Sequence, residues 1–218
     1  MANSTQATSG SMDRQWFIVG RWQEYEGEAR ANVLRILAIG AFYIVELVNY
    51  YGLQFGFLEM PKVVDQPFHQ AVTVLAVGWT VVSLGVLLCL AQRFFPAGLK
   101  YVSTGCDIVF LTAILTVADG PRSPLVVGYF LVIILATLRF NLPLIWAATV
   151  GSMLGYLFLL GYAKWFVVAD IRVPRYHQVI VLLALALSGI VLGQVIRRVR
   201  RLASEYADRV GSKEGVPS

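Results

Sequence analysis

The sequence predicts an all-α fold: a polytopic membrane helix bundle with six transmembrane helices. Of its 218 residues, 57% are hydrophobic and only 14% are charged, about half the charged share usual in a soluble domain. Six apolar stretches are each long enough to cross about 30 Å of hydrocarbon. The predicted spans are 33–55, 70–92, 99–118, 124–140, 142–166 and 177–196.

The remaining segments are too short to bury a hydrophobic core of their own, so no separate soluble catalytic domain fits in the chain. The motifs HExxH and GxSxG are also absent, and we therefore expect no enzymatic activity from this chain. Two cysteines, Cys89 and Cys106, can form neither a disulfide framework nor a four-ligand zinc site with the two histidines. The sequence assigns no cofactor.

The segment before the first span divides into two parts. Residues 1–12 are polar and are expected to form a disordered tail. Residues 13–32 mix Trp16, Phe17 and Trp22 with charged residues, which favours an amphipathic helix lying in the membrane interface. The alternative is that the tail stays disordered and its aromatic side chains dip into the headgroups at random.

The net charge of +5 is interpreted as a signal of orientation rather than of nucleic-acid binding. If both termini are cytoplasmic, the opposite side receives five of the 18 basic residues, and the cytoplasm receives the others. Those five are Lys62, Arg122, Lys164, Arg172 and Arg175. The positive-inside rule therefore predicts cytoplasmic N- and C-termini, in agreement with an even number of spans.

Two short turns explain where the central helices stop. Gly120 can take the left-handed position that ends span three, and Ser123 followed by Pro124 is a typical start for span four. Asn141 is a candidate cap for span five, with Pro143 in its first turn. Spans three to five are therefore expected to be antiparallel neighbours.

Two carboxyl groups are predicted to lie within the hydrocarbon. Glu46 is placed near the centre of span one, with Tyr43, Asn49 and Tyr50 on the same helical face. Asp107 follows Ser103 and Thr104 in span three. No Lys or Arg is predicted at their depth, so we expect no buried ion pair. These groups are either hydrogen-bonding residues that fix the packing or a ligand-binding or proton-sensitive site.

Other polar and small residues have two interpretations each. Arg139 is expected to extend to lipid phosphate rather than to pair with Asp107. His69 and His177 open spans two and six at one membrane face, where they either bind a metal or haem iron together or meet water and headgroups. The glycine pairs at 151 and 155 and at 189 and 193 indicate close helix packing, inside the bundle or between copies.

The last span is predicted to continue into the cytoplasm as a helix over 197–210, followed by a disordered tail at 211–218. A heptad-like apolar seam supports this continuation and would suit a parallel dimer. Its residues are Leu192, Val195, Val199, Leu202 and Tyr206. Arg197, Arg198, Arg200 and Arg201 would hold the helix at the anionic inner leaflet. The alternative is a basic stop-transfer end with a frayed helix.

The stretch from Asp107 to Leu160 resembles a known family. It has an Asp near the start of span three, a Gly-containing turn ending in Ser123-Pro124-Leu125, and the sequence Ala136-Thr137-Leu138-Arg139-Phe140 at the next turn. These features are similar to the six-helix membrane input domain of bacterial sensor histidine kinases, diguanylate cyclases and adenylate cyclases. In quinone-responsive members the turn has a second Gly, an Asn and a Phe, which this chain lacks.

The resemblance implies a sensory module in a bacterial cytoplasmic membrane. Such a module would form a homodimer and pass a signal through its last helix to a cytoplasmic kinase or cyclase output domain, on this chain or another. The alternative is a non-catalytic accessory subunit of a larger membrane complex. A transporter or intramembrane enzyme has little support, because no Ser/His pair can be argued at a common depth.

Overall fold

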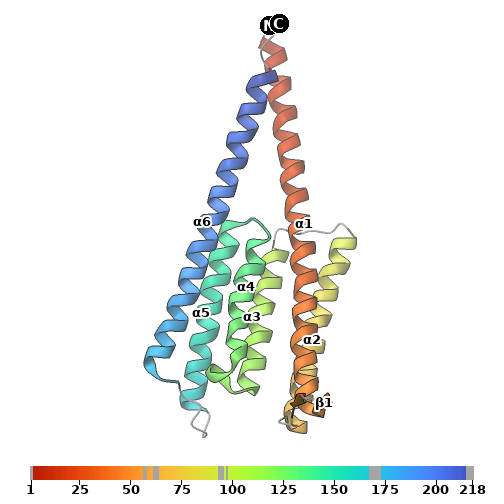
Figure 1. Ribbon diagram of the computed structural model, residues 1–218. Coiled ribbons are helices and arrows are strands. Elements are labelled where there is room, and N and C mark those ends of the chain that lie inside the picture. Colours follow the sequence, from red (N-terminus) through yellow and green to blue (C-terminus); the bar gives the residue numbers. More distant parts are fainter. Residues whose placement is uncertain are drawn as a thin grey trace. The chain divides into compact units, whose positions relative to one another are not determined.

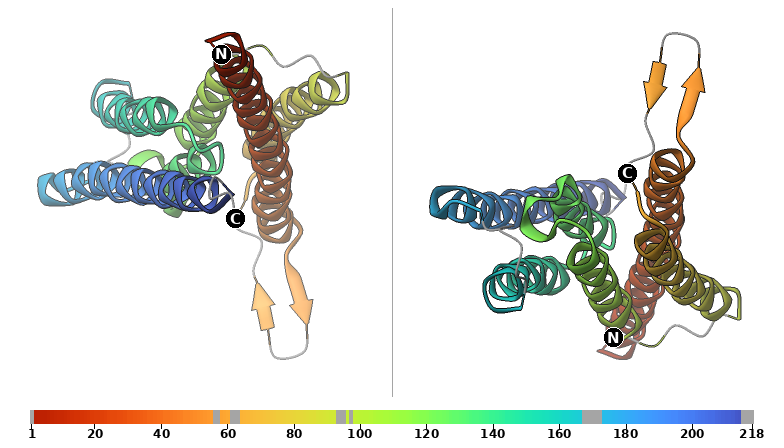
Figure 2. Two further views of the ribbon diagram at one scale, coloured as in Figure 1. Left: turned by 90° about the horizontal axis from the view of Figure 1, so that it is seen from above. Right: turned by 90° about the horizontal axis from the view of Figure 1, so that it is seen from below.

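The computed structural model describes residues 2–55, 58–60, 64–92, 96, 98–166 and 173–214. Side chains are described for 25–52, 64–92, 96, 98–166 and 173–205. These residues confirm the all-α prediction, with one short antiparallel β-hairpin added (Figures 1 and 2). The helices are α1 (Ala2–Tyr51), α2 (Gln66–Ala91), α3 (Leu99–Val117), α4 (Gly128–Thr137), α5 (Leu142–Trp165) and α6 (Arg175–Glu214). The strands are β1 (Leu53–Phe55) and β2 (Leu58–Met60), and two 3-10 turns are η1 (Gly120–Arg122) and η2 (Pro124–Val127).

Five helical segments are long and apolar enough to cross a membrane, which makes this a multi-pass integral membrane protein. They are Tyr25–Tyr51, Gln66–Ala91, Leu99–Val117, Leu142–Trp165 and Arg175–Glu205. The predicted fourth span is shorter, because η2 and α4 together cover only Pro124–Thr137. At about 1.5–2 Å per residue this segment is roughly 20–25 Å long, less than the hydrocarbon thickness.

Helices α1 and α6 are both longer than the sequence indicated (Figure 1). The predicted tail at 2–12 and the predicted interfacial helix at 13–32 lie within one uninterrupted helix, α1. That helix ends at Tyr51, where Gly52 adopts a positive φ of 73° and lets the chain turn into β1. At the other end of the chain, α6 continues through 211–214. Residues 1 and 215–218 lie outside the described part of the chain.

The chain forms two compact units. Unit 1 contains residues 1–103 and the short turn 138–140, and therefore holds α1, the β-hairpin, α2 and the start of α3. Unit 2 contains 104–137 and 141–218, which include the rest of α3 together with α4, α5 and α6.

In unit 1, a series of side-chain hydrogen bonds joins α1 to α2. The partner on α2 moves towards its start as the residue on α1 moves towards its end, as antiparallel helices in a fixed register require. The bonds are Tyr25 Oη to Leu90 O at 3.2 Å, Asn32 Nδ2 to Ser83 O at 2.9 Å, Tyr43 Oη to Thr73 Oγ1 at 3.1 Å, and His69 Nδ1 to Glu46 Oε1 at 2.8 Å. Polar contacts therefore follow the hairpin over most of its length.

In unit 2, helices approach each other closely at glycines. A Cβ at Gly189 of α6 would overlap the Thr149 side chain of α5. A Cβ at Gly155 of α5 would lie 2.9 Å from the hydroxyl oxygens of Thr112 and Tyr129. The glycines of both predicted pairs therefore face side chains of the same chain, which favours packing inside the bundle.

The turns of unit 2 contain the predicted left-handed glycine and the two predicted N-caps. Gly120 has a positive φ of 56°. The Ser123 hydroxyl accepts a hydrogen bond from Leu125 N at 3.3 Å, and Asn141 Oδ1 accepts one from Leu144 N at 3.2 Å. Both are N-cap interactions that satisfy otherwise free helical N–H groups.

Candidate functional site

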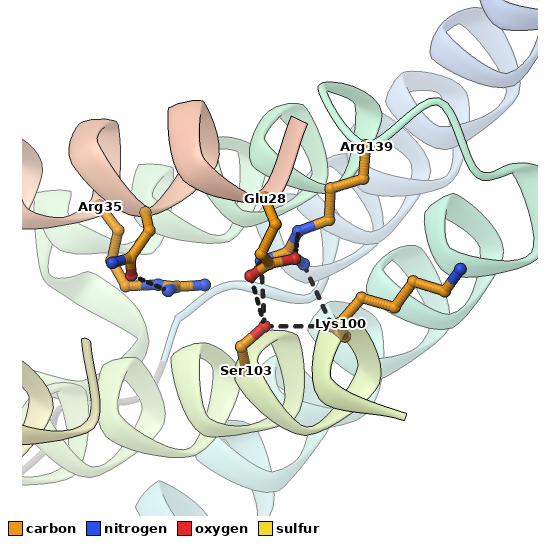
Figure 3. Close-up of polar contacts among 6 residues, drawn as sticks. Glu28, Arg35, Lys100, Ser103 and Arg139 are labelled. Carbon is orange, nitrogen blue, oxygen red and sulfur yellow. Dashed lines mark hydrogen bonds and ion pairs between the residues drawn. The ribbon is translucent and has the colours of Figure 1, made fainter. Parts of the chain in front are cut away.

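The most buried charged group of unit 1 is an ion pair between Glu28 and Arg139 (Figure 3). Their side chains are 0% and 2% exposed. Arg139 Nε lies 2.6 Å from Glu28 Oε2, and Nη2 donates to Oε1 at 2.8 Å, so the guanidinium contacts both carboxylate oxygens. Arg139 also donates to the Ser103 hydroxyl at 3.0 Å and to Lys100 O at 3.1 Å. The charges thus compensate each other and are also hydrogen-bonded, as buried ions require.

Gly27 brings the two backbones close enough for this pair to form. A Cβ at Gly27 would lie 2.6 Å from Leu138 O and 3.1 Å from the Cα of Arg139. These are backbone atoms, which cannot rotate away. The turn continues through Phe140, whose φ of 48° is unusual for a residue with a side chain. Both features indicate that the turn 138–140 is fitted to the surface of α1.

The ion pair corrects one prediction and reveals a missed residue. Arg139 does not extend to lipid phosphate, because it is buried against Glu28. The sequence analysis places Glu28 in the predicted interfacial helix and does not name it as a candidate site residue. The sequence did contain a signal: Glu28, Asn32 and Arg35 recur at steps of four and three, on one helical face. All three are buried, together with Ala31 on the same face.

Arg35 is a buried cation in α1. It is 2% exposed and lies ten residues into the candidate span Tyr25–Tyr51. Its Nη1 donates to Asn32 Oδ1 at 2.6 Å, while Asn32 Nδ2 donates to the carbonyl of Ser83 on α2. Arg35 is therefore a basic residue buried within a candidate span.

Glu46 has a titratable partner, His69 of α2, which the sequence analysis had placed at the membrane face. His69 Nδ1 and Glu46 Oε1 are 2.8 Å apart, with 16% and 9% of the two side chains exposed. The ring of Tyr50 stacks on the imidazole at a centroid distance of 4.0 Å and an interplanar angle of 10°. Glu46 Oε2 is buried and has no hydrogen-bond partner among the described residues.

This cluster lies near one end of the span rather than at its centre. Glu46 is five residues before Tyr51, the last residue of α1, and His69 is the fourth residue of α2. At about 1.5 Å per residue, Glu46 is therefore roughly 8 Å from the helix end. The earlier placement at mid-depth followed from extending span one to residue 55.

The remaining predicted residues are more dispersed. Asn49 is half-buried one turn after Glu46, and Asp107 is buried in α3 of unit 2 with 2% exposure. His177 is exposed in the first turn of α6. Within the described residues, no three His, Cys, Asp or Glu side chains are grouped so that they could hold a metal ion.

The apolar seam of α6 is exposed where its side chains are described. Val195, Val199 and Leu202 are 48%, 43% and 56% exposed, and Leu192 is half-buried. Tyr206 belongs to the same helix, but its side chain lies outside the described set. The buried face of α6 is a different one, formed by Leu185, Gly189, Gly193 and Ile196.

Comparisons with family models, curated proteins and solved structures give no match to this chain. Its function is therefore argued from the two buried polar clusters and from the exposed seam of α6. In the Glu28 cluster both carboxylate oxygens lie against the guanidinium of Arg139. In the Glu46 cluster one carboxylate oxygen faces the imidazole of His69, and the other has no described partner.

Proposed function

We propose that this protein is a membrane sensory module that forms a homodimer and transmits a signal through α6 to a cytoplasmic output domain, either a kinase or a nucleotide cyclase. The proposal includes six spans, with the short segment Pro124–Thr137 as the fourth, and cytoplasmic N- and C-termini. It also places the protein in a bacterial cytoplasmic membrane, following the resemblance of residues 107–160 to bacterial input domains.

The observation that carries the proposal is the continuity of α6. Its 40 residues span about 60 Å, roughly twice the thickness of the hydrocarbon. Beyond the predicted span 177–196, Val199 and Leu202 remain exposed beside Arg197, Arg198, Arg200 and Arg201, which are also exposed. Four arginines keep this segment in the aqueous layer, where lipid tails cannot cover the two apolar side chains.

A second copy of α6 is the partner that suits this seam. Val199 and Leu202 fall at a and d positions of the heptad, and a β-branched residue at a with Leu at d favours a two-stranded parallel coiled coil. A rigid helix that joins the membrane domain to such a coiled coil can carry a rotation or a shift to whatever follows it.

Cysteine crosslinking in native membranes tests the dimer. In a background in which Cys89 and Cys106 are replaced by Ser, V199C or L202C should form disulfide-linked dimers. The matched controls R200C and R201C, at positions b and c on the outer face of the heptad, should form far fewer. Equal crosslinking at all four positions, or crosslinking only to other proteins, would favour the accessory-subunit alternative.

Helical phase tests the signalling. A kinase or cyclase fused after Asp208 should change activity when one residue is inserted at the junction, because the insertion rotates everything downstream by about 100°. Insertion of seven residues should restore the original activity. An output that ignores phase would exclude transmission through α6.

Reporter fusions test the orientation. Reporters after Ser218 and before Asp13 should both be cytoplasmic, and one inserted within 167–176 should be on the opposite side. A C-terminal reporter outside the cytoplasm would overturn the proposal, because the output domain could not then be reached.

A further inference from the structure

We propose that Glu46 and His69 form a proton-binding site, and that its bound proton holds together the end of α1 and the start of α2. The Nδ1 to Oε1 distance of 2.8 Å is typical of a charge-assisted hydrogen bond between an imidazolium and a carboxylate. The pair with one shared proton is electrically neutral. Without that proton it carries one negative charge inside a span.

Two buried glutamates of α1, Glu28 and Glu46, show why the proton matters. Glu28 is balanced by Arg139, which is permanently charged, and its Oε1 also accepts a hydrogen bond from Ser103. Glu46 has only His69 as a described partner, and its Oε2 is buried without any. Loss of the proton therefore leaves the Glu46 carboxylate with no balancing charge among the described residues, and an isolated charge at such a site is strongly unfavourable.

The described groups around the pair supply no replacement cation. On α1, Tyr43 bonds to Thr73 of α2, while the rings of Tyr50 and Tyr51 contact His69. On α2, the one charged neighbour of His69 within a turn is Asp65, an exposed acid at the helix N-cap. All these described groups are neutral or acidic, so none of them can balance the charge of the Glu46 carboxylate.

The site can exchange protons with water. His69 is in the first turn of α2 and has 16% of its side chain exposed, and Glu46 is close to the end of α1. When the proton leaves, the neutral imidazole can still donate from Nδ1, but the carboxylate is no longer balanced by a positive charge. Hydration of the carboxylate is then favoured, and it loosens the contact between the two helix ends. If the chain is a sensory module as proposed above, the acidity at this membrane face is a stimulus that it detects.

The first test measures thermal stability and does not depend on signalling. The melting temperature is measured on the full chain in detergent or nanodiscs, with no polyhistidine tag. It should fall by several degrees between about pH 5 and pH 8. E46Q, which removes the titrating carboxyl but retains hydrogen-bonding capacity, should lose most of this dependence. The control H177Q, at the exposed histidine of α6, should keep it.

The second test observes the proton directly. In H177Q, His69 is the one remaining histidine of the sequence, so its imidazole NMR signal is unambiguous. Adding E46Q should shift the pH range over which this signal titrates, since the carboxylate no longer stabilises the imidazolium. The proposal is overturned if His69 titrates identically with and without E46Q, or if the pH dependence of stability is unchanged in E46Q. Failure of the α6 crosslinking with success here would reject the signalling function and leave the proton site intact.

Discussion

Helices α1 and α2 are held together differently from α3 to α6. In unit 1, hydrogen bonds connect α1 and α2, and a buried ion pair fastens the turn 138–140 to α1. In unit 2, the same task falls to glycines such as Gly155 and Gly189, which let helices approach until side chain meets backbone. Lipid tails are as apolar as the helices, so burial of leucine gives little driving force for association between spans. Membrane helices therefore associate through hydrogen bonds, as in unit 1, or through close packing at small residues, as in unit 2.

The two kinds of helix contact differ in whether the composition of the surrounding water can change them. Close packing at glycines depends on shape, and shape does not change with the composition of the surrounding water. A polar contact depends on the protonation and hydration of its members. Most of the buried charges that the structure describes, Glu28, Arg35, Glu46, Lys100 and Arg139, belong to unit 1, whereas Asp107 belongs to unit 2. We therefore expect unit 1 to be the more chemically sensitive of the two. Three predictions test this contrast.

The largest effect is expected at the buried ion pair. R139A should lower the free energy of unfolding by about 3–5 kcal/mol, because it leaves Glu28 buried without a balancing charge. The measurement is reversible unfolding in mixed micelles. The matched control is R30A, since Arg30 pairs with Glu26 on the exposed surface of α1, the helix that carries Glu28. A salt bridge there contributes about 0–1 kcal/mol. Equal effects of R139A and R30A would show that the buried pair does not hold unit 1 together.

Gly189 tests the other unit. G189A should cost about 1–3 kcal/mol, because the new methyl group would overlap Thr149. T149A in the same chain should recover part of the loss by removing the Oγ1 and Cγ2 atoms nearest to it. G85A is the control: no heavy atom lies within 4 Å of that Cβ, so alanine should be neutral or stabilise α2 by up to about 1 kcal/mol. A loss in G85A as large as in G189A would remove shape as the cause.

The two units also differ in how far the sequence could predict them. The caps at Ser123 and Asn141 and the turn at Gly120 were predicted correctly because each depends on a few adjacent residues. The Glu28 to Arg139 pair was missed because its members are 111 residues apart, and no local pattern connects them. The sequence predicts Glu46 as a candidate site residue because it lies in an apolar span, but it does not predict that His69 is its partner.

The error at Glu46 has a definite cause. Apolar and aromatic residues continue past Tyr51, so hydropathy extended span one to residue 55 and moved Glu46 towards the centre. The helix stops earlier because Gly52 adopts a left-handed conformation and begins a β-hairpin. With the end of α1 at Tyr51, Glu46 lies five residues before the end of α1, and His69 is the fourth residue of α2. The two residues are therefore close to the same end of the antiparallel hairpin, which explains why they pair.

The smallest effect is expected at Tyr43, in the middle of the series of α1–α2 hydrogen bonds. Its hydroxyl lies 3.1 Å from Thr73 Oγ1. Y43F should cost only about 0.6 kcal/mol, the average for a hydrogen bond between transmembrane helices. The loss is small because the Thr73 hydroxyl can turn back to the carbonyl four residues earlier, as Thr80 and Ser83 of the same helix already do. A double-mutant cycle with T73V measures the coupling directly. A coupling near zero would mean that the series fixes register without stabilising the hairpin, whereas a value above about 2 kcal/mol would exceed what such bonds contribute between transmembrane helices and would make Tyr43 a structural centre comparable to Glu28.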